Sequence, residues 1–166
     1  MERDAAAEAI TVAEIMTTEV VTTTPDRPVE EVARELRARG FGGLPVVDET
    51  GILVGVVSEF DVISKRGRTV AEIMTRGAIS VGDETGADRV TALMGLHGIR
   101  RVLVVRDGRL VGIVSRSDLL RLFSLVRWAC ADCGDYERGF ARPERCARCG
   151  STALHLELED RSTEGF

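Results

Sequence analysis

Four cysteines within one twenty-residue stretch are the side chains of this chain best suited to chemistry. They form two Cys-x-x-Cys pairs, Cys130 with Cys133 and Cys146 with Cys149, and glycine follows each pair. Such a pair can wrap one ion with its backbone amides turned toward the sulfurs, and glycine permits the positive φ that this turn needs. Four thiolates make a closed tetrahedral site without an open position for water. We therefore predict a structural zinc site with these four ligands.

Iron stays open as the bound metal, because tetrahedral sulfur suits both ions. Free thiols or a redox dithiol pair stay open too, although two pairs argue for metal. The segment resembles zinc ribbons and, more loosely, rubredoxin, in which the same ligand set holds iron and passes single electrons. Rubredoxin usually has proline after the third cysteine, where this chain has Ala147. With few apolar residues the ribbon should need its ion to fold, around a small core of Trp128, Tyr136 and Phe140.

An internal repeat organises the first three quarters of the chain. Residues Thr11–Thr17 recur letter for letter as Thr69–Thr75, 58 residues later. The match continues to the ends of both copies and, after a one-residue gap, aligns Asp61 with Asp118. The chain therefore contains one structural unit twice.

Each copy predicts the element order β-α-β-β-α. Proline suits the first turn of a helix and glycine the residue after its last turn, and Gly-containing turns join hairpin strands. Two such small sheets should pack into one α+β body with a shared core, because one copy cannot cover its own apolar surface. The predicted strands are 20–23, 44–47 and 53–57 in the first copy and 79–81, 102–105 and 110–114 in the second, with helices from Pro28 to Gly40, from Gly86 to Gly98, and after Ser58 and Ser115.

The repeated unit resembles the cystathionine-β-synthase (CBS) domain family, whose tandem pair is called a Bateman module. Three motifs carry the resemblance over residues 11–124, and each occurs in order in both copies. They are the opening Ala-Glu-Ile-Met-Thr, the central Leu44-Pro45-Val46-Val47-Asp48 and the closing Gly-hydrophobic-hydrophobic-Ser-x-x-Asp at 55–61 and 112–118. The resemblance implies a pseudo-twofold pair of motifs, a homodimer, and two clefts between the motifs for adenosine-containing ligands such as AMP, ADP, ATP or S-adenosylmethionine.

The resemblance also implies roles for individual residues. A carboxylate at a helix start can accept both ribose hydroxyl protons, while serine and nearby amides face a phosphate. The same Ser-x-x-Asp pattern is a helix capping box that needs no ligand, and both roles stay open. The expected ligand contacts are ribose at Asp61 and Asp118, ribose or the first phosphate at Ser58 and Ser115, the base along the backbone of Leu44, Pro45, Val46, Val102, Leu103 and Val104, and phosphate at Arg100, Arg101 and Arg116.

The two copies differ where a phosphate would lie. Gly42, Gly43 and Glu59 of the first copy correspond to the three arginines of the second, so phosphate should prefer the second copy. Leu103 stands in the second copy where the first has Pro45, which departs from the family pattern in the wall expected to hold the base.

Composition and absent motifs limit the function classes. The formal net charge is −5, and residues 126–150 hold five arginines against four acids. Four thiolates and one divalent ion would bring the balance of this segment to −1, which argues against nucleic-acid binding. The chain lacks a twenty-residue apolar run and a signal-peptide pattern, so we expect a cytoplasmic protein without a membrane span. Phosphate-binding loops, Gly-x-Ser-x-Gly and His-Glu-x-x-His are absent as well. We assign no catalytic residue, including His97 and His155.

The sequence thus predicts an N-terminal segment (1–10), two CBS motifs (11–67 and 68–125) and a zinc ribbon (126–166). The segment Asp4–Ile10 should add a helix to the homodimer. The predicted function is non-enzymatic: an adenine nucleotide binds the paired motifs, and the ribbon signals to an unidentified protein partner. Two further hypotheses are a rubredoxin-like iron electron carrier gated by nucleotide, and a nucleic-acid-binding ribbon on a CBS dimerisation scaffold.

Overall fold

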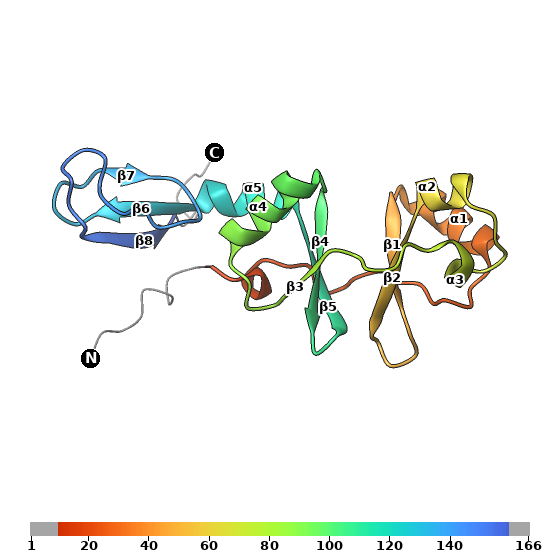
Figure 1. The fold of residues 1–166 in the computed structure, drawn as a ribbon. Helices are drawn as coiled ribbons and strands as arrows, with labels where there is room; N and C mark the ends of the chain where they lie inside the picture. Colours follow the sequence, from red (N-terminus) through yellow and green to blue (C-terminus); the bar gives the residue numbers. More distant parts are fainter. Residues whose placement is uncertain (1–9, 160–166) are drawn as a thin grey trace, which may run out of the picture. The chain divides into compact units, whose positions relative to one another are not determined.

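The computed structural model describes residues 10–159, so residues 4–9 of the predicted N-terminal helix lie outside the described residues. The chain divides into two compact units, one made of residues 17–83 and 102–113 and the other of 84–101 with the described parts of 1–16 and 114–166. The elements are η2 Val12–Glu14, α1 Val29–Arg39, β1 Gly43–Val47, β2 Leu53–Ser58, α2 Glu59–Ser64, α3 Val70–Ile73, β3 Ser80–Gly82, α4 Ala87–His97, β4 Arg101–Arg106, β5 Arg109–Ser115, α5 Arg116–Leu125, β6 Val126–Cys130, β7 Tyr136–Glu137 and β8 Leu154–Leu158 (Figure 1).

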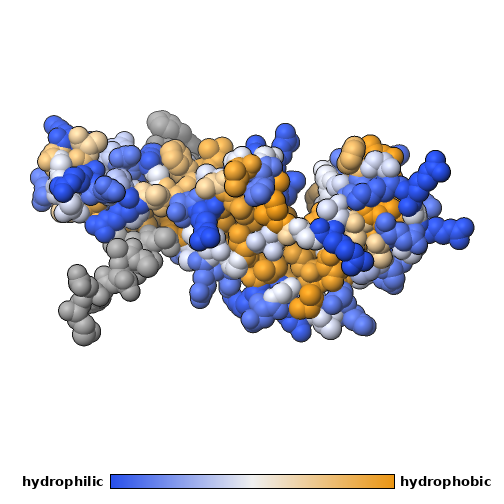
Figure 2. Space-filling model, in the orientation of Figure 1, coloured by the Kyte–Doolittle hydropathy of each residue, from blue (hydrophilic) through white to orange (hydrophobic). Residues whose placement is uncertain are grey.

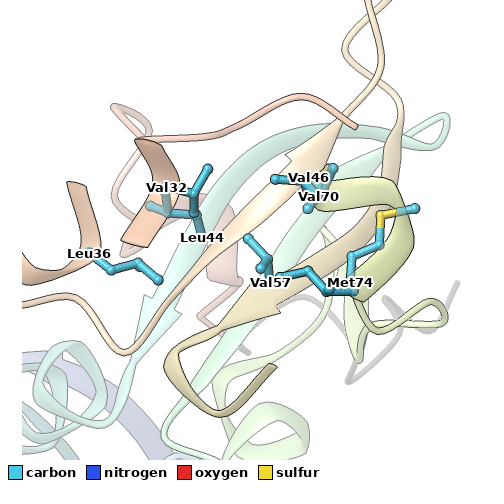
Figure 3. Close-up of a cluster of buried hydrophobic side chains, with 8 residues drawn as sticks. Val32, Leu36, Leu44, Val46, Val57, Val70 and Met74 are labelled. Atoms are coloured by element: carbon cyan, nitrogen blue, oxygen red, sulfur yellow. The ribbon is translucent and has the colours of Figure 1, made fainter. Parts of the chain in front are cut away.

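A buried apolar cluster fixes the end of β2, where the first Ser-x-x-Asp motif begins. Strand β1 pairs antiparallel with β2, with Leu44 opposite Val57. Alternate residues of a strand and residues four apart on a helix share one face, so β1 and α1 can bury the same cluster. The buried members are Val32, Leu36, Leu44, Val46, Val57, Val70, Ile73 and Met74 (Figure 3).

The second sheet has the strand order β3-β4-β5. Strand β3 runs parallel to β4, with Ser80 opposite Leu103. Helix α4 ends before Gly98, which adopts the left-handed conformation with φ of 64°, as the sequence predicts for a glycine after a last turn. Helix α5 follows β5 directly at Ser115.

The predicted strand 20–23 is wrong, because Thr23 makes only an isolated parallel bridge to Val46. The Thr23 amide donates to the Pro45 carbonyl at 2.9 Å, and the Val47 amide donates to the Thr23 carbonyl at 3.0 Å. To extend this parallel pairing toward residue 21, the next hydrogen bond would need the backbone amide of residue 45 as its donor. Proline lacks that amide hydrogen. Leu103 supplies that amide in the second copy, where β3 is a strand.

The C-terminal segment forms a three-stranded sheet in the order β7-β6-β8, drawn in blue in Figure 1. Trp128 is 1% exposed, and its Nε1 donates to the Gly139 carbonyl at 3.1 Å, so it belongs to the core as predicted. Phe140 is half-buried and packs edge-to-face against Phe123. Tyr136 is 52% exposed, which corrects its assignment to the core. Both residues of the short strand β7 face solvent, and the Arg127 guanidinium lies 5.0 Å from the Tyr136 ring centre.

Among the described residues, no helix combines the length and the apolar character that crossing a membrane would require.

Candidate functional site

Each Ser-x-x-Asp motif lies where a strand passes directly into a helix. Ser58 caps α2 and Ser115 caps α5, with nearly identical backbone angles. The Ser58 amide donates to Asp61 Oδ2 at 2.8 Å and the Ser58 hydroxyl to the same oxygen at 2.6 Å. Ser115 makes the same two bonds to Asp118 Oδ2, at 2.8 and 2.6 Å. Both capping boxes are therefore formed, and in each one carboxylate oxygen, Oδ1, remains outside the cap.

The outer oxygen of Asp61 is held by two further side chains. Lys65 Nζ lies 2.6 Å from Asp61 Oδ1, and the Thr75 hydroxyl donates to the same atom at 3.1 Å. Asp61 is only 5% exposed. Burial acts to raise its pKa, but the hydrogen bonds from Lys65, Ser58 and Thr75 outweigh burial and hold the pKa of Asp61 below its ordinary value. This carboxylate is an ionised, fully bonded group of the first copy.

The outer oxygen of Asp118 has a different environment. Among residues 10–159, the closest cation is Arg121, whose Nη2 lies 3.7 Å from Asp118 Oδ1 and whose side chain is 73% exposed. That distance exceeds a hydrogen bond, and exposed pairs of this kind contribute little. Asp118 thus presents a carboxylate edge that a ligand hydroxyl could use.

The three arginines expected at a phosphate are all exposed. The Arg116 amide donates to the Arg100 carbonyl at 3.1 Å, and Arg116 Nε donates to the Ile99 carbonyl at 3.1 Å. The first copy repeats the backbone contact, from the Glu59 amide to the Gly42 carbonyl at 3.0 Å. The two copies share this backbone geometry and differ in charge, with Arg116 in place of Glu59.

The residues expected along the base lie on β1 and β4. All six are buried: Leu44, Pro45, Val46, Val102, Leu103 and Val104. Figure 3 shows Leu44 and Val46 within the apolar cluster. Their role at the base stays a prediction.

The four cysteine sulfurs lie within 4.8 Å of one another. The Sγ atoms of Cys130 and Cys149 are 3.6 Å apart, as are those of Cys133 and Cys146. A tetrahedral ion with bonds of about 2.3 Å would place its sulfurs roughly 3.8 Å apart. The donor set and its spacing therefore fit a zinc or iron ion.

Both cysteine pairs adopt the same turn. The Gly134 amide donates to the Cys130 carbonyl and the Gly150 amide to the Cys146 carbonyl, each at 2.9 Å. Both glycines have positive φ, 73° and 74°, as the sequence predicts. The Ser151 hydroxyl donates to Asp132 at 2.5 Å and so links the two turns.

Because the four thiols are crowded together, their pKa values differ widely. The Cys133 amide stabilises the Cys130 thiolate and, against burial, lowers the pKa of Cys130 to about 7. The Asp135 amide acts to lower the pKa of Cys133, but burial and the three neighbouring sulfurs raise it to about 12. Four thiolates at this spacing repel one another, so a cation is needed for all four to ionise together.

Sequence reasoning missed Lys65 and Thr75. Lys65 follows the last residue of α2, four positions after Asp61, and this spacing is a signal that could have predicted their ion pair. Thr75 approaches Asp61 from fourteen residues away, and no local pattern indicates that contact.

Both copies of the repeat match a known protein family. The family is the CBS domain, whose sequence model matches residues 12–67 and 70–125. L-aspartate semialdehyde sulfurtransferase of Methanocaldococcus jannaschii is 34% identical over 116 residues, covering 68% of this chain and 23% of the relative, so the chain spans less than a quarter of that protein.

Two solved structures show the same fold. The crystal structure of CBSX2 in complex with AMP has a TM-score of 0.63 at 30% identity and covers 67% of this chain and 93% of that one. A CBS domain pair in complex with 5′-methylthioadenosine and S-adenosyl-L-methionine has a TM-score of 0.61 at 33% identity and covers 70% and 97%.

Proposed function

Because this chain belongs to the CBS domain family, we propose that it is a regulatory module that binds an adenosine-containing ligand and transmits its presence to a partner. The observation that carries the proposal is the carboxylate that each copy holds at the start of a helix, with a serine hydroxyl and backbone amides beside it. Related structures contain AMP, or 5′-methylthioadenosine with S-adenosyl-L-methionine. The same class of ligand is therefore proposed here.

Ser115 and Asp118 provide the clearest form of such a site. Ser115 fixes Asp118 Oδ2 through two hydrogen bonds, which orients the carboxylate before any ligand arrives. Asp118 Oδ1 can then accept a ribose hydroxyl proton, as a charge-assisted hydrogen bond. The exposed guanidiniums of Arg100, Arg101 and Arg116 supply positive charge for a phosphate, and the start of the ten-residue helix α5 adds to it.

We propose that the four cysteines hold one zinc ion. When bound, the ion would cross-link the two Cys-x-x-Cys turns and neutralise crowded thiolates. Cys130 and Cys146 are buried with Leu154 in one small cluster, so the metal ligands are themselves much of the core of the ribbon. The ion is therefore a structural component that keeps the ribbon folded for a protein partner.

Iron binding and nucleic-acid binding are weaker hypotheses for the ribbon. Ferric tetrathiolate absorbs visible light and zinc does not, so the colour of the purified protein separates the two metals. Four of the five arginines of residues 126–150 already contact groups of the ribbon or of α5, which leaves little free charge for phosphate. They are Arg127 with Glu157 and Glu159, Arg138 with Ser124 and Glu159, Arg142 with Thr152 and Leu154, and Arg145 with Gly150.

A thermal-shift series tests the ligand proposal. Nucleotide-free protein is heated with AMP, ADP, ATP, NAD or S-adenosylmethionine, and ligand at a hundred times its dissociation constant should add about 2.7 kcal/mol of stability. The variant Asp118→Ala should lose this stabilisation and keep its metal. Wild-type protein that none of the five ligands stabilises would contradict the proposed function.

A further inference from the structure

The two Ser-x-x-Asp sites share their capping geometry but differ in what surrounds one carboxylate oxygen. In both copies the serine occupies Oδ2 of the aspartate in the same way, at 2.8 Å from its amide and 2.6 Å from its hydroxyl. Any difference in ligand binding at the two aspartates must therefore come from what surrounds Oδ1.

In the first copy, a cation of the chain itself occupies that oxygen. Lys65 Nζ lies 2.6 Å from Asp61 Oδ1 and also donates to the Ile73 carbonyl at 2.8 Å and to the Thr75 hydroxyl at 3.2 Å. Three acceptors therefore fix the ammonium group, and Thr75 donates to Asp61 as well. A ribose hydroxyl could also donate to this carboxylate, but as a neutral donor it would lack the ion-pair attraction that the Lys65 ammonium adds. A ligand would have to displace the stronger donor.

In the second copy, the residue that corresponds to Lys65 is Leu122, which is 6% exposed and carries no charge. Within the described part of the chain, the cation near Asp118 Oδ1 is the exposed Arg121 at 3.7 Å. The phosphate side differs in the same sense, because Arg116 stands where the first copy has Glu59 and both side chains are exposed. The environment of the Asp118 carboxylate and the positive charge of Arg116 therefore both favour ligand binding in the second copy.

We propose that Lys65 acts as a built-in occupant of the first site, so that the chain binds one adenosine-containing ligand, at Ser115 and Asp118. This inference rests on the proposed function and adds to it the choice of site and the residue that makes the choice. Lys65 thereby determines stoichiometry: it replaces the ligand in the first copy and holds α2 to the segment around Ile73 and Thr75.

The test is calorimetric titration of AMP into the nucleotide-free, metal-loaded full chain and three variants. Wild-type protein should bind about one AMP, Asp118→Asn should bind at least about tenfold more weakly, and Asp61→Asn should keep close to wild-type affinity. Lys65→Leu, which gives the first copy the residue type of the second, should bind a second AMP. If Lys65→Leu does not fold, the two aspartate variants still decide the choice of site.

Two kinds of result overturn the inference and can be told apart. Two AMP sites in wild-type protein, loss of binding in Asp61→Asn but not in Asp118→Asn, or a folded Lys65→Leu that still binds one AMP would overturn the choice of site alone. An absence of saturable heat with AMP, ADP, ATP and S-adenosylmethionine in wild-type protein would overturn the proposed function together with it.

Discussion

At the scale of single residues, a buried hydroxyl distinguishes the first copy from the second. Thr23 is 3% exposed, and within the described part of the chain its Oγ1 has no hydrogen-bond partner. The corresponding residue of the second copy is Val81. Thr23→Val should therefore stabilise the protein by about 1 kcal/mol, because a buried hydroxyl without a partner costs about that much.

Urea unfolding measures this effect as a higher midpoint at an unchanged slope. Thr24→Val is the matched control, since the Thr24 hydroxyl donates to Asp26 at 2.6 Å and its loss should not stabilise. A lower midpoint for Thr23→Val would show that the Thr23 hydroxyl has a partner in solution.

The pKa of Asp61 leads to a pH dependence. Its pKa in the folded protein lies below the ordinary value, so the ionised carboxylate stabilises the fold above the unfolded pKa of about 3.9. This contribution is lost as the pH falls through the folded pKa. Asp61→Asn should therefore be less stable than wild type near pH 7, by about 1–2 kcal/mol for a weakened cap and ion pair, and the gap should narrow below about pH 4.

Chemical unfolding of wild type and Asp61→Asn at several pH values measures how the stability difference between them changes with pH. A gap that stays constant from neutral to acid pH would mean that the ionised form of Asp61 contributes nothing. Asp118 has no lysine among the described residues as close as Lys65 is to Asp61, so Asp118→Asn should lose less stability relative to wild type near pH 7.

At the scale of elements, local signals predicted most boundaries and failed where a single backbone group decides. Pro28 and Gly40 frame α1 at Val29–Arg39, and the turn residues frame β1 and β2 to within one residue. The strand at 20–23 failed because Pro45 lacks an amide on the partner strand, which no pattern within 20–23 reveals. The repeated opening heptapeptide forms a short helix in both copies, Val12–Glu14 and Val70–Ile73, which we did not predict from the sequence.

The folding of the ribbon should depend on its metal ion. Trp128 is the only tryptophan of the chain and is buried in the ribbon, so its fluorescence reports on the ribbon alone. Chelation at neutral pH should shift its emission to the red as the ribbon unfolds, while the far-UV signal of α1 and α4 persists. Cys149→Ser should behave like chelated protein. A metal-free protein with an unchanged, buried Trp128 would contradict a structural role for the ion.

At the scale of the whole molecule, the apolar face of α4 and α5 is a candidate contact surface for the homodimer expected from the sequence. Leu120 is 70% exposed and lines a hollow of about 360 Å³ together with Leu119, Phe123 and Phe140. Figure 2 shows apolar atoms gathered over these helices. Contiguous exposed apolar surface commonly serves as a protein–protein contact.

Leu120→Glu should therefore shift the protein from dimer to monomer in light scattering. Leu158→Glu, at a 67% exposed leucine of β8, is the control that should leave the mass unchanged. Equal masses for wild type and Leu120→Glu would place any dimer contact elsewhere.

Function at this scale could be predicted only in part. The repeated motifs predicted the fold family, and the two Cys-x-x-Cys pairs predicted a cluster of four sulfurs that the structure brings together. The ion pair of Asp61 with Lys65 was within reach of the sequence, but the contacts that Ile73 and Thr75 make with Lys65 were not, because these residues approach from a separate segment.

The central claim is that Asp118 anchors the ribose of an adenosine-containing ligand. The most direct measurement compares AMP with 2′,3′-dideoxy-AMP in equilibrium dialysis against nucleotide-free protein. We predict that AMP binds and that the analogue, which lacks both ribose hydroxyls, binds about tenfold or more weakly, as expected for a lost hydrogen bond to a charged group. Equal binding of the two ligands would remove the ribose role of Asp118, and binding of neither would contradict the claim as a whole.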